Sequence, residues 1–163
     1  MEAKALAKDR LDRFDRKILE HIQTDGDLGP SELSTRIHLS PSQCSRRLQR
    51  LRDEGYIERT AAILNPARLN LGISAYIAVR LRSQAPDAER TFRTRVEAMS
   101  EVVSCDYTTG EMDFMLRVYT KDLETYSEFL SSKLLVGEEV DNVRTFIIMK
   151  QLKKTTALSL DFC

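Results

Sequence analysis

The sequence predicts an α+β protein, with a helical N-terminal part followed by strands and helices in the order βαββαβ. In the first part, apolar residues recur every three or four positions, which is the spacing of an amphipathic helix. After residue 72, short runs that alternate apolar and polar residues are separated by helical patterns. The predicted division is a tail at 1–10, a helical domain at 11–64, a linker containing Pro, Asn and Gly at 65–72, an α+β domain at 73–154 and a second tail at 155–163.

The first two predicted helices have recognisable boundaries. Asp12 is a suitable N-cap for a helix that ends near Ile22. A shorter helix over residues 30–37 begins at Pro30, which fits the first helical position because it needs no amide there. His38 then occupies a turn position that requires a positive φ, which histidine tolerates better than most residues.

The third predicted helix has the clearest start. Ser40 can cap it through its hydroxyl, Pro41 fits its first position, and Gln43 completes a capping box. A helix, a short turn and a basic helix form the helix-turn-helix pattern, and residues 56–66 look like a short two-stranded wing. We therefore predict a winged helix-turn-helix domain. The apolar stripe that would face its core is Cys44, Leu48 and Leu51.

The other sides of this basic helix carry side chains that can donate hydrogen bonds to phosphates and base edges. Arginine can contact guanine and glutamine can contact adenine through paired hydrogen bonds. An ordinary solvated helix is the alternative, and Arg47, beside the apolar stripe, could equally form an ion pair within the chain. The predicted DNA-binding residues are Ser42, Gln43, Ser45, Arg46 and Arg50 on the helix and Arg59 near the tip of the wing.

The charge balance bears on the partner. The chain has no net charge, and residues 1–64 hold 12 Lys and Arg against 11 Asp and Glu. A single copy would bind DNA weakly, because affinity grows with the number of phosphates neutralised, so DNA binding would favour an oligomer. The sequence shows no apolar run of membrane length and no signal peptide, and its three widely spaced cysteines fit a reducing cytoplasm.

The order of elements in the second domain is that of a ferredoxin-like fold. Its two helices would cover one face of the sheet. The other face also carries apolar residues that nothing else in the chain can cover, so we expect a second copy, related by a two-fold axis, to pack on it. The predicted strands are 73–81, 102–108, 113–119 and 143–152, and the predicted helices are 87–99 and a segment capped by Asp122 that reaches Leu134.

The sequence lacks recognisable catalytic, phosphate-binding and metal-binding motifs. It has no Ser/His/Asp or Cys/His motif, no Walker-type phosphate loop and no zinc-ligand spacing. We therefore expect no enzyme activity, no catalytic residue, no metal site and no cofactor other than a bound effector.

Residues 11–160 together resemble the Lrp/AsnC family, the leucine-responsive or feast/famine regulators of bacteria and archaea. The first two of four matching segments indicate only a winged helix-turn-helix, whereas the order of all four, including the turn from Gly110 to Asp113, is much more specific. Two positions depart from the family pattern: His38 replaces a usual turn glycine, and Gly29-Pro30 replaces a hydroxyl cap. The segments are LDRFDRKILEHIQTDG, ELSTRIHLSPSQCSRRLQRLRDEGYIER, TTGEMDFMLRVYTKDLETYSEFL and NVRTFIIMKQLKKTTALSL.

The resemblance implies a C-terminal domain that oligomerises and senses a small molecule, usually an amino acid bound near the turn between the second and third strands. There the ammonium group could pair with Glu111 or Asp113, while turn amides and threonine hydroxyls hold the carboxylate. The alternative is an ordinary hairpin turn whose geometry Asp113 fixes. The predicted effector-binding residues are Thr108, Thr109, Gly110, Glu111, Met112 and Asp113.

These observations predict a sequence-specific DNA-binding transcriptional regulator whose oligomeric assembly responds to a small-molecule effector, with an amino acid as the expected effector. The expected partners are double-stranded DNA, the amino acid and further copies of the chain, which form a homodimer that assembles to a tetramer or octamer in the cytoplasm, away from membranes. One alternative is an architectural, nucleoid-type DNA-binding protein without an effector. A small ferredoxin-like enzyme with a docking domain is a third hypothesis, but it needs a pocket of perturbed ionisable groups that the sequence does not supply.

Overall fold

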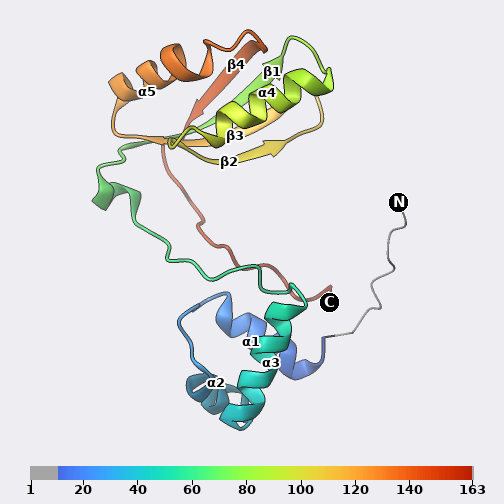
Figure 1. Ribbon diagram of the computed structural model, residues 1–163. Helices are drawn as coiled ribbons and strands as arrows, with labels where there is room; N and C mark the ends of the chain where they lie inside the picture. Colours follow the sequence, from blue (N-terminus) through green and yellow to red (C-terminus); the bar gives the residue numbers. More distant parts are fainter. Residues whose placement is uncertain (1–10, 163) are drawn as a thin grey trace. The chain divides into compact units, whose positions relative to one another are not determined.

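The computed structural model describes residues 11–162, so the tail predicted at residues 1–10 lies outside the described residues (Figure 1). The chain forms two compact units, which are described separately below. The first holds the described residues before Leu64 together with those from Lys153 onward, and the second is Leu64–Leu152.

The first unit is built from three short helices, α1 (Arg13–Ile22), α2 (Pro30–Ile37) and α3 (Pro41–Asp53). Between α2 and α3 the chain turns at His38, whose φ of 58° and ψ of 47° lie in the left-handed region, as the sequence predicts. The three helices bury one apolar cluster formed by Leu11, Ile18, Leu19, Ile22, Leu28, Leu33, Ile37, Cys44, Leu48 and Leu51.

The segment after α3 differs from the expectation. No strand forms in residues 56–65, so the two paired strands expected for the wing over residues 56–66 are absent from the described chain (Figure 1). The segment lacks the Asn-Gly or Asp-Gly pair that a tight hairpin requires, and an isolated two-stranded hairpin is marginally stable in water. A short 3-10 helix, Pro66–Leu69, follows it.

The C-terminal segment folds back onto the helices of the first unit. The side-chain amide of Gln23 donates to the carbonyl oxygen of Leu158 over 3.0 Å, and the backbone amide of Leu158 donates to Gln23 Oε1 over 2.9 Å. Leu160 packs against the apolar cluster of the three helices. The segment therefore contributes to the core of the first unit. Its sequence has no periodic apolar pattern from which this contact could be predicted.

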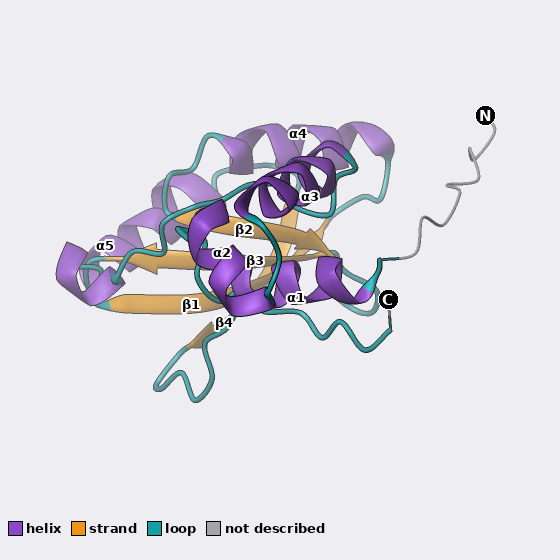
Figure 2. Cartoon of the chain, turned by 90° about the horizontal axis from the view of Figure 1, so that it is seen from below, coloured by secondary structure: helices purple, strands orange, loops and turns teal. Residues whose placement is uncertain are grey.

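The second unit is an antiparallel sheet in the spatial order β2-β3-β1-β4, with both helices on one side (Figures 1 and 2). The chain order is βαββαβ, which confirms the predicted ferredoxin-like arrangement. A short π-helix, Leu130–Leu134, extends the second helix. The elements are β1 (Ile73–Leu81), α4 (Pro86–Glu97), β2 (Val102–Tyr107), β3 (Phe114–Thr120), α5 (Leu123–Phe129) and β4 (Val140–Ile147).

The last strand is displaced from its predicted position at 143–152. It begins at Val140, which pairs with Leu81 next to a register shift in β1. It ends at Ile147, which pairs with Ala75, and beyond that pair the amide of residue 148 donates to the carbonyl of residue 74 over 2.8 Å.

Helices cover one face of the sheet and leave the other face open. Ala75, Ile77 and Val79 of β1 are buried under α4 and α5, and the hydroxyls of Tyr126 and Thr145 lie 2.6 Å apart on that side. On the open face, defined here by Tyr76, Ala78, Met115, Arg117, Tyr119 and Phe146, register pairs bring the side chains together.

An arginine lies among aromatic rings on the open face. Its guanidinium carbon is 4.6 Å from the ring centroid of Tyr76 and 5.2 Å from that of Tyr119. The Nε of Arg117 is buried and has no hydrogen-bond partner among the residues that the structure describes. Tyr76 and Phe146 remain 42% and 55% exposed. The face thus combines exposed aromatic surface with an unsatisfied buried donor, both of which a packed partner would relieve.

Candidate DNA interface and effector site

Helix α3 presents a polar, basic surface because its start and its core stripe are fixed locally. The Ser40 hydroxyl accepts a hydrogen bond from the Gln43 amide at 3.3 Å, and Gln43 Oε1 accepts from the Ser40 amide at 3.1 Å. The predicted stripe of Cys44, Leu48 and Leu51 is buried. The polar residues therefore face outward, and those predicted to contact DNA are all exposed: Ser42, Gln43, Ser45, Arg46 and Arg50.

The arginines of α3 differ sharply in what they contact. Arg47 Nη1 lies 2.7 Å from both Asp12 Oδ2 and Asp15 Oδ1, so the ion pair that the sequence left open is formed. Arg50 Nη2 lies 2.6 Å from Asp15 Oδ2, although its side chain stays 45% exposed. Arg46 is exposed and makes no ion pair within the described chain. Of these three, Arg46 is the arginine that an incoming phosphate or base would meet unopposed.

Arg59 lies in the extended segment that follows α3. Its side chain is exposed, and the segment has no strand partner in the described residues. The structure therefore leaves Arg59 accessible, without bringing it into a defined cluster with the polar residues of α3.

The contact between α1 and α3 predicts a pH effect. Burial tends to raise the pKa of Asp12, but the amides of Asp15 and Phe14 and the Arg47 guanidinium lower it from 3.8 to about 2. Because the folded pKa is the lower one, the ionised carboxylate stabilises the fold above about pH 4, and this contribution is lost as the pH falls toward 2. We expect urea unfolding to show a smaller loss of stability between these pH values for Asp12→Asn than for the wild type. Equal losses would contradict the assignment.

The turn between β2 and β3 contains the predicted effector residues. The Thr108 amide donates to the Asp113 carbonyl at 2.8 Å, and the Thr108 hydroxyl donates to the Met112 carbonyl at 2.9 Å. Gly110, with a φ of 117°, supplies the left-handed conformation that the turn needs. These bonds bring the six residues into one compact loop and leave the Thr109, Gly110 and Glu111 part of it exposed.

The two acids of this turn have different roles. Asp113 is buried, and its Oδ2 accepts a hydrogen bond from the Leu81 amide at 2.7 Å while Gln84 donates to its Oδ1 at 3.4 Å. Its carboxylate thus ties the turn to the end of β1, as the alternative interpretation of the sequence held. The Glu111 carboxylate is 79% exposed, with Arg144 Nη1 at 3.5 Å. It is the carboxylate that a ligand could reach.

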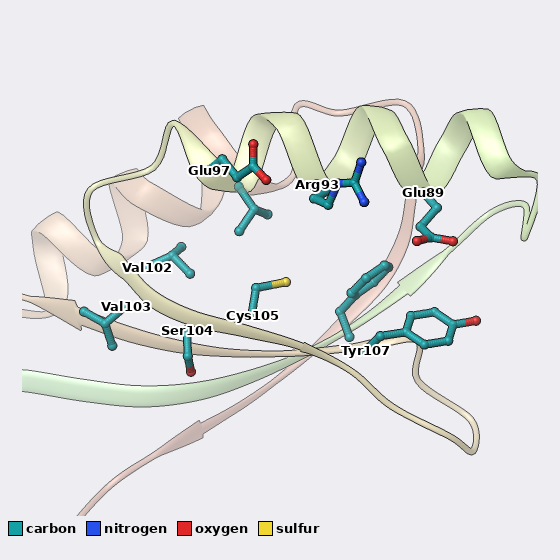
Figure 3. Close-up of a pocket in the computed structure, with 10 residues that line it drawn as sticks. Glu89, Arg93, Glu97, Val102, Val103, Ser104, Cys105 and Tyr107 are labelled. Carbon is teal, nitrogen blue, oxygen red and sulfur yellow. The ribbon is translucent and has the colours of Figure 1, made fainter. Parts of the chain in front are cut away.

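A cleft of about 470 Å³ lies between α4 and the edge strand β2 (Figure 3). The Cys105 side chain points from β2 toward α4, and Arg93 lies on the helix opposite. This cleft is not among the sites predicted from the sequence. The signal for it was the spacing of Glu89, Arg93 and Glu97, which puts three charged side chains on one helical face toward the strand.

Two features are absent from residues 11–162. No group of three or more His, Cys, Asp or Glu side chains there is placed to hold a metal ion. No helix in that range is both long enough and apolar enough to cross a membrane.

Comparison with known families places both units. Residues 11–58 match a family model described as winged helix-turn-helix DNA-binding, and residues 74–158 match one described as the Lrp/AsnC ligand binding domain. The leucine-responsive regulatory protein of Escherichia coli K12 is 34% identical over 148 residues, which cover 91% of this chain and 90% of that protein.

Solved structures agree with this match. A transcriptional regulator from Neisseria meningitidis in complex with L-methionine is 40% identical, with a TM-score of 0.90 over 93% of this chain and 98% of that one. The feast or famine regulatory protein of Mycobacterium tuberculosis, complexed with L-methionine, is 28% identical, with a TM-score of 0.82 over 91% of this chain and 99% of that one. By sequence and by fold, the chain belongs to the Lrp/AsnC family of DNA-binding transcriptional regulators.

Proposed function

We propose that this protein regulates transcription by binding specific DNA sequences as an oligomer and that an amino acid controls its assembly. The observation that carries the proposal is the outward polar face of α3 in one unit, joined in the same chain to a second unit with an open, aromatic sheet face. The functional division follows the predicted domains: residues 11–64 contact DNA, and residues 73–154 assemble and sense the effector. The protein acts as a regulator and not as an enzyme, in the cytoplasm.

The proposed DNA contacts come from one side of α3. Arg46 reads a guanine or binds a phosphate, and Gln43 uses its side-chain amide nitrogen as a donor because its oxygen already accepts from the Ser40 amide. Two short hydroxyl side chains let the first turn approach the groove closely. Arg50, like Arg46, contacts a guanine edge or a phosphate, and Arg59 reaches the backbone. The full set is Ser42, Gln43, Ser45, Arg46, Arg50 and Arg59.

Removing the unopposed arginine tests this interface. We expect Arg46→Ala to weaken binding to a selected duplex by about 10- to 100-fold, since a good bidentate base contact is worth about 1–3 kcal/mol. Gel-shift titration at fixed salt measures the change. The control is Arg93→Ala, which removes the same charge from α4 in the other unit. Equal affinities of the two variants would refute the proposed interface.

The proposed effector is an amino acid held at the β2–β3 turn. Support comes from the L-methionine complexes of the Neisseria and Mycobacterium relatives and from the exposed Glu111 carboxylate. Glu111 pairs with the ammonium group, and the turn amides around Gly110 hold the carboxylate. Asp113 keeps the loop in shape through the Leu81 amide. The remaining proposed contacts are Thr108, Thr109 and Met112.

Ligand-dependent melting separates this function from an effector-free architectural role. At a ligand concentration a hundred times its Kd, binding to the folded state adds about 2.7 kcal/mol of stability. We expect a thermal-shift screen of the common amino acids, starting with L-methionine, to raise the melting temperature of the wild type. Glu111→Gln should largely remove that rise, while Glu124→Gln on α5 should keep it. A flat response of the wild type to every amino acid would favour the architectural alternative.

The proposed assembly is a homodimer joined through the open sheet faces, which associates further into tetramers or octamers. A two-fold axis would bring two copies of the Tyr76 and Phe146 surface together and exclude water from it. It would also offer acceptors to the buried Arg117 Nε, which lacks one within the described chain. Pairing two recognition helices doubles the phosphate contacts that a neutral chain can make.

A further inference from the structure

We propose that Asp15 of α1 determines the DNA specificity of this regulator by holding Arg50 of α3 in one orientation. The inference rests on the proposed contact between α3 and DNA and adds to it a residue that never touches the duplex. Asp15 acts as a positioning residue, because its effect passes through the arginine that it binds.

The Asp15 carboxylate is placed between two arginines. It is 1% exposed, and its two oxygens are divided between them: Oδ1 lies 2.7 Å from Arg47 Nη1, and Oδ2 lies 2.6 Å from Arg50 Nη2. Oδ2 also accepts the backbone amide of Asp12 at 3.1 Å, which completes the capping box of α1. Both oxygens of this buried carboxylate therefore accept from donors on α3 or at the start of α1.

Arg47 and Arg50 respond differently to this carboxylate. Arg47 has a second acid, Asp12, within 2.7 Å and is only 21% exposed, so it serves as a structural tie between the helices. Arg50 keeps 45% of its side chain exposed, and its other acidic neighbour, Glu54, is at 3.7 Å from Nε. One end of the Arg50 guanidinium is thus fixed on Asp15 while the rest of the side chain faces solvent.

A guanidinium fixed at one end loses most of its conformational freedom before DNA arrives. A preorganised fork can meet a base edge in one geometry only, which favours the matching sequence over others. Arg46, which has no acidic partner in the described part of the chain, is not held in this way before DNA binds. The pairing with Asp15 also cancels part of the Arg50 charge and so limits unspecific attraction to any duplex.

The test compares the full-length wild type with Asp15→Asn, which keeps the side-chain shape and removes the charge. Affinity is measured for a duplex that the wild type selects from a random pool and for a scrambled duplex, over a range of salt concentrations. We expect the ratio of the two affinities to fall at least tenfold. In the variant, Arg50 is freed from Asp15 and can pair with a phosphate. On scrambled DNA, each such new phosphate contact should steepen the slope of log affinity against log salt by about 0.9.

Matched variants keep the outcome unambiguous. Asp12→Asn removes the same charge from the same helix end, but Arg47 is the one arginine of α3 that Asp12 contacts, so the variant should leave the specificity ratio and the slope near the wild-type values. Arg50→Gln, added to Asp15→Asn, should abolish the extra slope. Should Asp15→Asn fail to fold, Arg50→Lys supplies the test: it keeps the charge, loses the planar fork, and should lower the specificity ratio at an unchanged slope.

The experiment distinguishes failure of the Asp15 positioning role from failure of the proposed DNA-binding function. If Asp15→Asn, or Arg50→Lys in its place, retains the wild-type specificity ratio while Arg46→Ala loses affinity, the positioning role is wrong and the DNA interface stands. If the wild type binds no duplex at low salt, the proposed function itself fails.

Discussion

Replacing Phe92 by alanine is expected to lower the free energy of unfolding of the second unit by about 3–5 kcal/mol. Phe92 is a residue of α4 whose side chain is completely buried, and its ring centroid lies 4.8 Å from that of Phe114 on β3. Truncation would remove this contact and leave a cavity between helix and sheet, which the rigid strands cannot close. Urea unfolding of the full chain, followed by circular dichroism, measures the change.

Arg93→Ala is the matched control for this substitution, because it lies one position further along α4 with its side chain exposed. We expect its unfolding midpoint to stay near that of the wild type, within the range typical of surface substitutions. A Phe92→Ala protein as stable as the control would mean that the helix does not pack on the sheet as described.

Placing a charge on the open sheet face is expected to separate the subunits. Phe146 is 55% exposed in the single chain, so Phe146→Glu should leave the fold intact. In a two-fold interface the change occurs twice and buries two carboxylates without partners, which costs several kcal/mol. We expect the dimer dissociation constant to rise at least a hundredfold in analytical ultracentrifugation, with a parallel loss of DNA affinity.

The control for this experiment is Leu123→Glu. Leu123 is 59% exposed at the start of α5, and α5 packs on the opposite side of the sheet, so the same charge is added outside the proposed interface. The Leu123→Glu protein should keep the wild-type sedimentation behaviour. Dimers of Phe146→Glu as tight as those of the control would rule out the open face as the interface.

The features predicted well from the sequence are local ones. The Ser40 cap, the left-handed His38 turn and the buried stripe of α3 depend on residues a few positions apart, so their pattern is complete within one segment. The alternation in residues 73–81 likewise matches the bounds of β1. The start of α3 and the order of the sheet elements follow from such signals.

The features that were missed depend on contacts between distant segments. Arg50 looks on sequence like a free cation, and only the fold brings Asp15 within 2.6 Å of it. The sequence left two roles open for Asp113, an ammonium ligand or a residue that fixes the turn, and only the fold shows that its carboxylate accepts the amide of Leu81 in β1. In both cases the neighbouring residues in the sequence suggest a charged side chain that is open to a ligand. The folded chain instead gives that side chain a partner from a distant segment.

The return of the C-terminal segment makes the DNA-binding unit discontinuous in sequence. Leu158 and Leu160, which engage Gln23 and the helical core, are synthesised only after the whole second unit. A truncated peptide ending near Ile63 would therefore lack part of its own hydrophobic packing and should melt at a lower temperature than the same helices in the intact polypeptide. The chain therefore passes between the helices and the sheet twice, rather than once.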